Sequence, residues 1–451
     1  MRAELFSVSQ LESHAKSLAA AHQLGAPDKE GRLLARLSAN QASLGDAYSL
    51  IADAVSRGRQ ITPAAEWFVD NYHLIEEQIR IAIRHLPKGY SEELPHLIDK
   101  TPRVYDLALE LISHSHGHVD IDTLTAYIAA YQTITPLCLG ELWAIPIMLR
   151  IALIENLRRV ISVVTAGRSE RESAAVWADR MLEGAAGDPS RVVKVLAELS
   201  ETNPSLTIPF VAELAARLQG QGAVASLPMA WLEQRLEAQG QTIDQVFQSA
   251  TQSQAADGVA VGNSITSLRT LDAIDWREFV EALSVVEQVL RRDEIYPKME
   301  FATRDRYRHV VEKLAKRGKL SERSVAEKAI EIAAARPPGR EHHVGYFLID
   351  AGKRSLELAL KEKPHRDAAS VRLGAGIAGY IALIAFITIC FTLFVADITM
   401  AHRHHHIVWI VVWAIGVAVC ASQLAIAIVQ WAATLMFKPL PLPRMDLSKG
   451  I

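Results

Sequence analysis

This sequence contains few cysteines, and its net charge is close to zero. Its 451 residues include three cysteines, at positions 138, 390 and 420, and the last two lie in apolar runs where a thiol behaves as a small hydrophobic group. Neither a disulfide framework nor a cysteine zinc site is therefore expected. Because 48 basic residues balance 51 acidic ones, the chain also lacks the positive excess typical of nucleic-acid-binding domains, and no nucleic-acid partner is expected.

Catalytic motifs are also missing from the sequence. It contains no Gly-rich phosphate loop, no Ser/His/Asp order and no H-E-x-x-H string. Asp120 and Asp122 form an Asp-x-Asp pair, but they open a helical pattern, so Asp120 is expected to be an N-cap rather than part of a nucleotide-sugar site. We predict no catalytic, cofactor-binding or metal-ligating residue. The N-terminus lacks the apolar stretch of a secretory signal, so the first part is expected to stay in the cytoplasm.

Alternating β-branched runs are rare, whereas apolar residues recur every three or four positions. The fold class is therefore predicted to be all-α. An irregular multi-helix cytoplasmic domain is expected over residues 1–336, with a candidate break into two lobes near 185–205, followed by a linker and juxtamembrane helix at 337–371. Thr62-Pro63 and Thr135-Pro136 are predicted to open helices that end near Leu86 and Val164, and further helices are expected at 232–260 and 264–290.

Two long uncharged runs lie near the C-terminus. At about 1.5 Å per residue each exceeds the roughly 30 Å of a bilayer core, so residues 372–397 and 407–437 are predicted to form a two-helix transmembrane hairpin. Residues 398–406 are then an outward-facing loop and 438–451 a cytoplasmic linker. Lys and Arg on both flanks predict that the N- and C-termini are cytoplasmic, and the bilayer is a predicted partner.

Two groups of residues predict that this hairpin packs against other helices. Gln423 and Gln430 are seven residues apart and share a helix face, and an unpaired amide in hydrocarbon is costly. Ala375 and Gly379 form a small-xxx-small pair that permits close backbone approach. We predict a membrane packing face made of these four residues. Lining of a translocation path remains the alternative.

The most polar helix pattern in the soluble part contains a possible contact face. Its members are Glu66, Trp67, Asp70, His73 and Glu77. A structural ion-pair face is the favoured interpretation, and contact with a partner or a sugar is an alternative. A metal site would need a second Glu-x-x-His pattern on another helix, which is not found.

Histidines and aromatic residues supply two further alternatives. His114, His116 and His118 alternate in a turn, and His402, His404, His405 and His406 crowd the expected outer loop. Polar loops are the favoured interpretation of both groups, with metal binding, or titration near pH 6 in the outer loop, as alternatives. A sugar- or nucleotide-binding module would use Trp67, Tyr72, Trp143 or Trp276 for stacking, but core packing of these rings is favoured.

Several long strings resemble the cyclic β-1,2-glucan synthase family, which consists of very large bacterial inner-membrane enzymes. The strings are ITPAAEWFVDNYHLIEEQIR (61–80), LPKGYSEELP (86–95), LGELWAIPIMLRIALIENLRR (139–159), VGNSITSLRTLDAIDWREFVE (261–281), YPKMEFATRDRYRHVVEKLA (296–315) and HHVGYFLIDAGKRSLE (342–357). The resemblance covers nearly the whole chain, in the order of the family. It implies the N-terminal region of such a synthase, ending before the glucosyltransferase domain.

The resemblance also implies what lies outside this sequence. UDP-glucose and a divalent metal belong to the transferase domain, and a phosphorylase-like domain sets glucan length, so both domains, or a subunit carrying them, are expected partners. No catalytic residue is carried over to this chain. The main hypothesis is a membrane-anchoring and scaffolding part of a cyclic β-1,2-glucan synthase in the bacterial inner membrane. The alternative is a membrane-anchored helical interaction scaffold unrelated to sugar chemistry.

Overall fold

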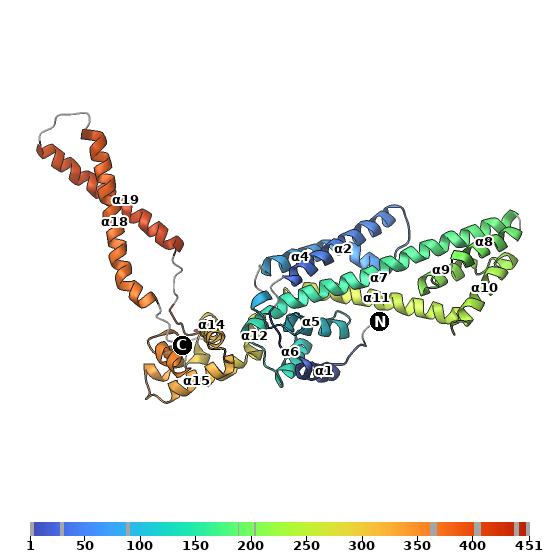
Figure 1. The fold of residues 1–451 in the computed structure, drawn as a ribbon, viewed down its shortest axis with the longest axis horizontal. Helices are drawn as coiled ribbons and strands as arrows, with labels where there is room; N and C mark the ends of the chain where they lie inside the picture. The colour runs from blue at the N-terminus through green and yellow to red at the C-terminus, as the bar shows by residue number, and fades with distance from the viewer. Residues whose placement is uncertain are drawn as a thin grey trace. The chain divides into compact units, whose positions relative to one another are not determined.

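The computed structural model describes residues 4–27, 31–86, 91–187, 189–202, 204–360, 368–400, 407–436 and 442–447. Over these residues the chain is helical and forms no strand, apart from isolated bridges such as that between Leu24 and Leu97. The all-α prediction is confirmed. The chain divides into two compact units, Met1–Glu287 and Gln288–Ile451 (Figure 1). The domain boundaries inferred from sequence, at residues 336, 371 and 185–205, stay predictions.

The first unit is a set of α-helices of very different length. Their bounds are α1 Val8–Ala21, α2 Arg32–Ser56, α3 Pro63–Asp70, α4 Tyr72–His85, α5 Arg103–His114, α6 Ile121–Gln132, α7 Leu139–Gly187, α8 Pro189–Thr202, α9 Ile208–Leu218, α10 Ser226–Glu237, α11 Ile243–Thr270 and α12 Trp276–Leu283. Short 3-10 turns lie at Ser91–Glu93 and Gly222–Ala225.

The second unit contains shorter helices followed by two long apolar ones. Their bounds are α14 Phe301–Gly318, α15 Glu322–Ala334, α16 Val344–Ile349, α17 Lys353–Ala359, α18 Ala368–Met400 and α19 Ile407–Met436, with 3-10 turns at Tyr296–Lys298 and Arg340–His342. Helix α13, Val285–Leu290, spans the point where the two units divide.

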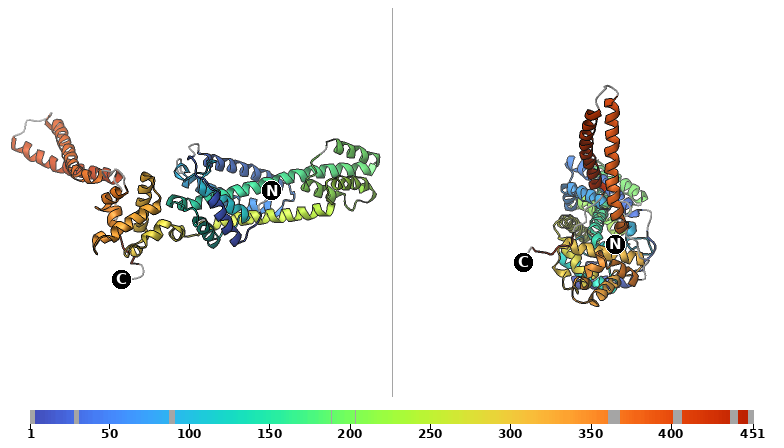
Figure 2. Two further views of the ribbon diagram at one scale, coloured as in Figure 1. Left: turned by 60° about the horizontal axis from the view of Figure 1, so that its bottom comes forward. Right: turned by 90° about the vertical axis from the view of Figure 1, so that its left-hand side faces the viewer.

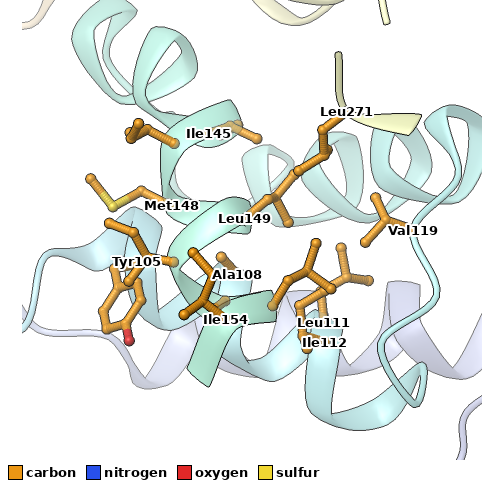
Figure 3. Close-up of a cluster of buried hydrophobic side chains, with 14 of the residues drawn as sticks. Tyr105, Ala108, Leu111, Ile112, Val119, Ile145, Met148, Leu149, Ile154 and Leu271 are labelled. Carbon is orange, nitrogen blue, oxygen red and sulfur yellow. The ribbon is translucent and has the colours of Figure 1, made fainter. Parts of the chain in front are cut away.

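Helix α7 organises the first unit, since α2, α4, α5, α9 and α11 all pack against it. The long rods of α7 and α11 run beside each other in Figure 1 and Figure 2. The buried residues Met148 and Leu149 of α7 meet Tyr105 and Leu111 of α5, and Leu271 closes the same cluster at the end of α11 (Figure 3). Burial of this apolar surface is the main stabilising contribution to the unit.

A second hydrophobic cluster lies at the far end of α7. It joins Met181 of α7 to Leu199 of α8, Phe210 of α9, Leu232 of α10 and Val246 of α11. Apolar side chains from either side of the α7–α8 junction thus share one core.

Several helix bounds expected from sequence are wrong. Helix α7 begins at Leu139 rather than at Thr135 and continues past Val164 to Gly187, because Glu141 turns back to accept from the amide of Cys138 (2.9 Å) and its later turns remain packed. The helices expected at 232–260 and 264–290 are also wrong. Gly240, at φ +70, ends α10, and a capping box of Thr242 and Gln245 starts α11, which runs unbroken to Thr270.

The membrane prediction is confirmed in part. Among the described residues, one helix is long and apolar enough to cross a membrane, Val411–Leu435 in α19. The apolar stretch described in α18, Gly379–Val395, is shorter, so the two-helix hairpin stays a prediction. The side chains of 368–378, including Ala375, and the linking residues 401–406 with their histidines lie outside the described set. So do the flanking residues 361–367, 437–441 and 448–451.

Candidate functional site

The predicted contact face lies on two helices rather than one. Helix α3 ends at Asp70 and α4 begins at Tyr72, because the backbone of Asn71 leaves the helical region at φ −110° and ψ 13°. The Asn71 side chain donates to the carbonyl of Trp67 at 2.9 Å, which satisfies an acceptor at the end of α3. The break therefore inserts a kink between the two halves of the contact face.

All five predicted members of this face are exposed: Glu66, Trp67, Asp70, His73 and Glu77. The indole of Trp67 is 47% exposed, which is unusual for so large an apolar ring and marks a possible contact point. No ion pair or side-chain hydrogen bond among the described residues involves the four titratable members. The carboxylates and the imidazole thus project into solvent in this chain.

The inner side of α4 is fixed by a partly buried polar clamp that the sequence did not predict. Gln78 donates from Nε2 to Oδ2 of Asp272 at 2.7 Å and accepts at Oε1 from Nε of Arg150 at 2.9 Å. Arg150 also pairs with Asp272. Because Gln78 and Asp272 are 194 residues apart, no local spacing signals this clamp. It holds the outer face of α4 on a rigid support formed by α7 and the end of α11.

Three of the four candidate stacking aromatics are occupied by packing. Tyr72 stacks on Tyr48 with ring centroids 4.1 Å apart. Trp143 and Trp276 pack against the main core, and the indole Nε1 of Trp276 donates to the carbonyl of Leu271 at 3.0 Å. The indole of Trp67 is consequently the one of these four rings most open to a ligand or a partner.

A groove of about 700 Å³ lies between the start of α3 and the middle of α7 and α9. Arginines lining it are mostly neutralised by neighbouring carboxylates: Arg59 and Arg168 both pair with Glu172 at 2.7 and 2.8 Å, and Arg217 pairs with Asp179 at 2.9 Å. Burial lowers the pKa of Arg171. Such a mixed-charge lining favours hydroxyl-rich or polar ligands over a free phosphate, which needs unneutralised cations.

The Asp-x-Asp pair adopts the capping role expected of it. Asp120 accepts from the amide of Thr123 at 2.8 Å and is the N-cap of α6. Burial acts to raise the pKa of Asp120, but hydrogen bonds from Thr123 and the nearby His118 outweigh it and lower that pKa. The N-cap prediction is therefore confirmed.

Three of the four residues of the predicted membrane packing face, Gln423, Gln430 and Gly379, lie outside the buried surface of α19 that faces α18. Ala421, Ala425 and Val429 are buried on one side of α19, at the four-residue spacing of a helix contact, and α18 packs along α19. Gln423 and Gln430 are exposed on α19. Gly379 of α18 is also exposed, and no atom of the described residues lies within 4 Å of an added Cβ. The glutamines are thus left free to meet other helices.

The architecture defines an α-helical protein with a membrane-compatible apolar helix near its C-terminus. No family model matches the sequence. The chain is 32% identical over 378 residues to the cyclic beta-(1,2)-glucan synthase NdvB of Rhizobium meliloti (strain 1021), covering 81% of this chain and 13% of that protein.

This chain is accordingly related to the cyclic β-(1,2)-glucan synthase family, and the resemblance drawn from the sequence strings is confirmed. The similarity runs through most of the helical chain but corresponds to a small part of the relative's length. The relationship and the apolar α19 are together consistent with association with a membrane.

Proposed function

We propose that this chain is the N-terminal, membrane-anchoring and scaffolding part of a cyclic β-1,2-glucan synthase. The observation that carries the proposal is the 32% identity to the Rhizobium enzyme over 81% of this chain. UDP-glucose and a divalent metal would bind a transferase domain outside this sequence. That domain and a phosphorylase domain, or a subunit carrying them, are the proposed partners.

Anchoring is proposed to use α18 and α19 as a transmembrane hairpin. Large apolar side chains project outward from both helices, including Phe386 (65% exposed) and Phe394 (62%) on α18 and Ile415 (60%) on α19. Hydroxyls of Thr388 and Thr392 on α18 are satisfied within the helix by carbonyls four residues earlier, at 2.8 and 2.7 Å. Lipid would cover these apolar side chains, and the two threonine hydroxyls would not be left unpaired in it.

The proposed location is the bacterial inner membrane with both termini in the cytoplasm. Basic residues on the two flanks of the hairpin support this orientation. Fusion of a periplasm-active reporter enzyme at either end of the chain tests it: both fusions should be inactive, whereas a fusion between residues 398 and 406 should be active. Activity at one terminus alone would contradict a hairpin.

Scaffolding is proposed to use the contact face of α3 and α4 in the cytoplasm and the glutamine face of α19 in the membrane. The α3–α4 face combines an exposed indole with unpaired carboxylates on a rigid support, which suits a polar protein partner. Gln423 and Gln430 would donate and accept hydrogen bonds from further transmembrane helices of the synthase.

Reconstitution of glucan synthesis tests the scaffolding role. This chain is co-expressed with the transferase-bearing remainder, and incorporation of labelled UDP-glucose into cyclic glucan is measured in membranes. We expect synthesis well above that given by the remainder alone. Equal synthesis with and without the chain would contradict the proposed function and would favour a scaffold unrelated to sugar chemistry.

Charge reversal on the contact face refines this test. Asp70→Arg with Glu77→Arg should reduce synthesis and co-purification with the remainder. The matched control reverses Glu233 and Glu237, two exposed carboxylates four residues apart on α10, and should leave both unchanged. Equal effects of the two pairs would point to net charge rather than to a docking face.

A further inference from the structure

Two histidines and a glutamate converge where α1 packs on α5. Nε2 of His14, from α1, lies 2.8 Å from Oε2 of Glu110, and Nε2 of His114 lies 3.5 Å from the same oxygen. Glu110 and His114 are four residues apart on α5 and so share a helix face. One donor atom from each of the three residues falls within 4.8 Å of the other two.

The ring of His114 is held with one nitrogen directed at this point. Its Nδ1 lies 2.7 Å from the carbonyl oxygen of Glu4. A carbonyl can only accept, so Nδ1 carries the proton and Nε2 keeps its lone pair for a ligand. Phe6 stacks on the ring at 3.9 Å between centroids and 5° between planes. A metal-ligating histidine usually has this kind of second hydrogen bond, which fixes its tautomer and orientation.

His14 approaches from the opposite element with little freedom. Leu11 and Ala15 on either side of it along α1 are buried in the main core, and the imidazoles of His14 and His114 are 4.9 Å apart between centroids. The side chains of His14, Glu110 and His114 are 25%, 34% and 15% exposed. The cluster is therefore partly dehydrated, yet it remains open to an entering ion and a water molecule.

The donor set selects the kind of ion. Two imidazole nitrogens and one carboxylate oxygen suit Zn²⁺ and related transition metals, whereas Mg²⁺ and Ca²⁺ prefer all-oxygen sites. A tetrahedral ion with bonds of about 2.0–2.1 Å separates its ligand atoms by about 3.3 Å. The His114–Glu110 separation already matches this, and the His14–Glu110 separation needs to widen by about 0.5 Å as the proton between them leaves.

We propose that His14, Glu110 and His114 bind a divalent transition metal, with Zn²⁺ the best fit and water at the fourth position. The ion fastens α1 and the segment before it to the end of α5. Neither His116 nor His118 of the turn belongs to this group of three side chains. Nε2 of His118 instead lies 3.8 Å from Oδ2 of Asp120. This inference does not depend on the proposed role in glucan synthesis.

Metal titration of the purified full-length chain in detergent tests the proposal. His402, His404, His405 and His406 are first replaced by glutamine, because they form an independent candidate for ion binding. Zn²⁺ is titrated in competition with a chromophoric chelator, and Co²⁺ is added to observe the visible absorption of a tetrahedral site. We expect one Zn²⁺ per chain, a tetrahedral Co²⁺ spectrum, and a Zn²⁺-dependent rise in the melting temperature.

Single substitutions identify the ligands. His14→Gln, Glu110→Gln and His114→Gln should each weaken Zn²⁺ binding by at least about tenfold and abolish the tetrahedral Co²⁺ spectrum. The double variant of His116→Gln with His118→Gln is the matched control and should bind as the parent does. Glu110→Gln keeps the size of the side chain and its capacity for hydrogen bonding to His14, so it separates loss of a ligand from misfolding.

Two results would overturn the proposal. One is a parent chain, lacking the outer-loop histidines, that binds no Zn²⁺. The other is unchanged affinity in the Glu110→Gln and His114→Gln variants when circular dichroism shows native helix content. Neither result would bear on the synthesis assay, so this inference and the proposed function can fail separately.

Discussion

Helices α7 and α19 are both long and contain runs of apolar residues, yet their surroundings in the fold differ completely. Ile145, Met148 and Leu149 of α7 are at most 2% exposed, because α5 and α11 cover them. On α19, Val412, Ile415 and Val419 are 56–60% exposed, and the helix packs chiefly along α18. An apolar helix is thus a core element or a membrane element depending on what covers it.

Charge distinguishes the two helices before any packing is known. Helix α7 carries Glu141, Arg150 and Glu155 on its buried turns, each paired with a residue from another part of the chain. Helix α19 carries no acidic or basic side chain. A charged side chain in a protein core can be stabilised by an opposite charge from another helix or by water. In hydrocarbon neither is present and the charge is costly, so the uncharged helix is the one suited to lipid.

The largest expected effect comes from placing charge on α19. Val419→Arg with Ile428→Arg should cost about 5 kcal/mol of insertion free energy if these positions face lipid. The chain should then leave the carbonate-resistant membrane fraction. Val176→Arg with Val193→Arg, at similarly exposed positions of the first unit, is the control and should change nothing. Retention of the α19 variant in membranes would contradict the prediction that these positions of α19 face lipid.

A somewhat smaller effect is expected at the buried ion pair of α7. Arg103 and Glu141 are 4% and 0% exposed, so Glu141→Leu leaves a buried guanidinium without its carboxylate. We expect a loss of about 3–5 kcal/mol in unfolding free energy, measured by chemical denaturation in detergent. The corresponding change in an exposed pair, Glu172→Leu, should cost less than about 1 kcal/mol. Similar losses would show that burial is not the deciding factor.

Core packing can be compared directly between the helices. Leu149→Ala should destabilise the first unit by about 2–5 kcal/mol, because its neighbours in Figure 3 cannot collapse fully into the space left behind. Leu424→Ala on α19, where the side chain is 45% exposed, should leave denaturation of that unit within about 0.5 kcal/mol of the parent. A large effect at Leu424 would imply an additional protein contact there.

The smallest expected effect concerns pH and the part of the second unit that precedes α18. Burial acts to raise the pKa of Asp293, but hydrogen bonds from His343 and the amides of Val344 and Tyr296 outweigh it and lower that pKa to about 2. A lowered folded-state pKa stabilises above the unfolded value of 3.8 and ceases to do so as pH falls through about 2. Asp293→Asn should therefore cost about 2 kcal/mol at pH 7.

The pH dependence provides the check on that variant. The stability difference between the parent and Asp293→Asn should shrink between about pH 4 and pH 2, as followed by denaturation at a series of pH values. Helix α19 has no carboxylate or basic group, so its membrane retention should not follow this profile. A constant difference across the range would mean that the Asp293 charge is not what stabilises the fold.

Helix class and several helix ends could be predicted from the sequence because their causes are local. Thr62 and Asp120 cap the helices that follow them, as their hydroxyl and carboxylate predict. The contacts of Asn71 at the break between α3 and α4 could not be predicted, because the side chain of Arg269 donates to it from 198 residues away. The exposure of the α3–α4 contact face was predictable from its polarity, but the clamp through Gln78 and Asp272 was not.

By itself the sequence determined that this protein is helical, that it contains long apolar runs and that it is related to the cyclic β-(1,2)-glucan synthases. These properties reside in short-range spacing and in residue identity, which need no partner elsewhere in the chain. Only the tertiary structure decided which apolar faces are covered and that His14 meets Glu110 across 96 residues. Contacts of this kind depend on how whole helices pack against one another, and no local sequence pattern specifies that packing.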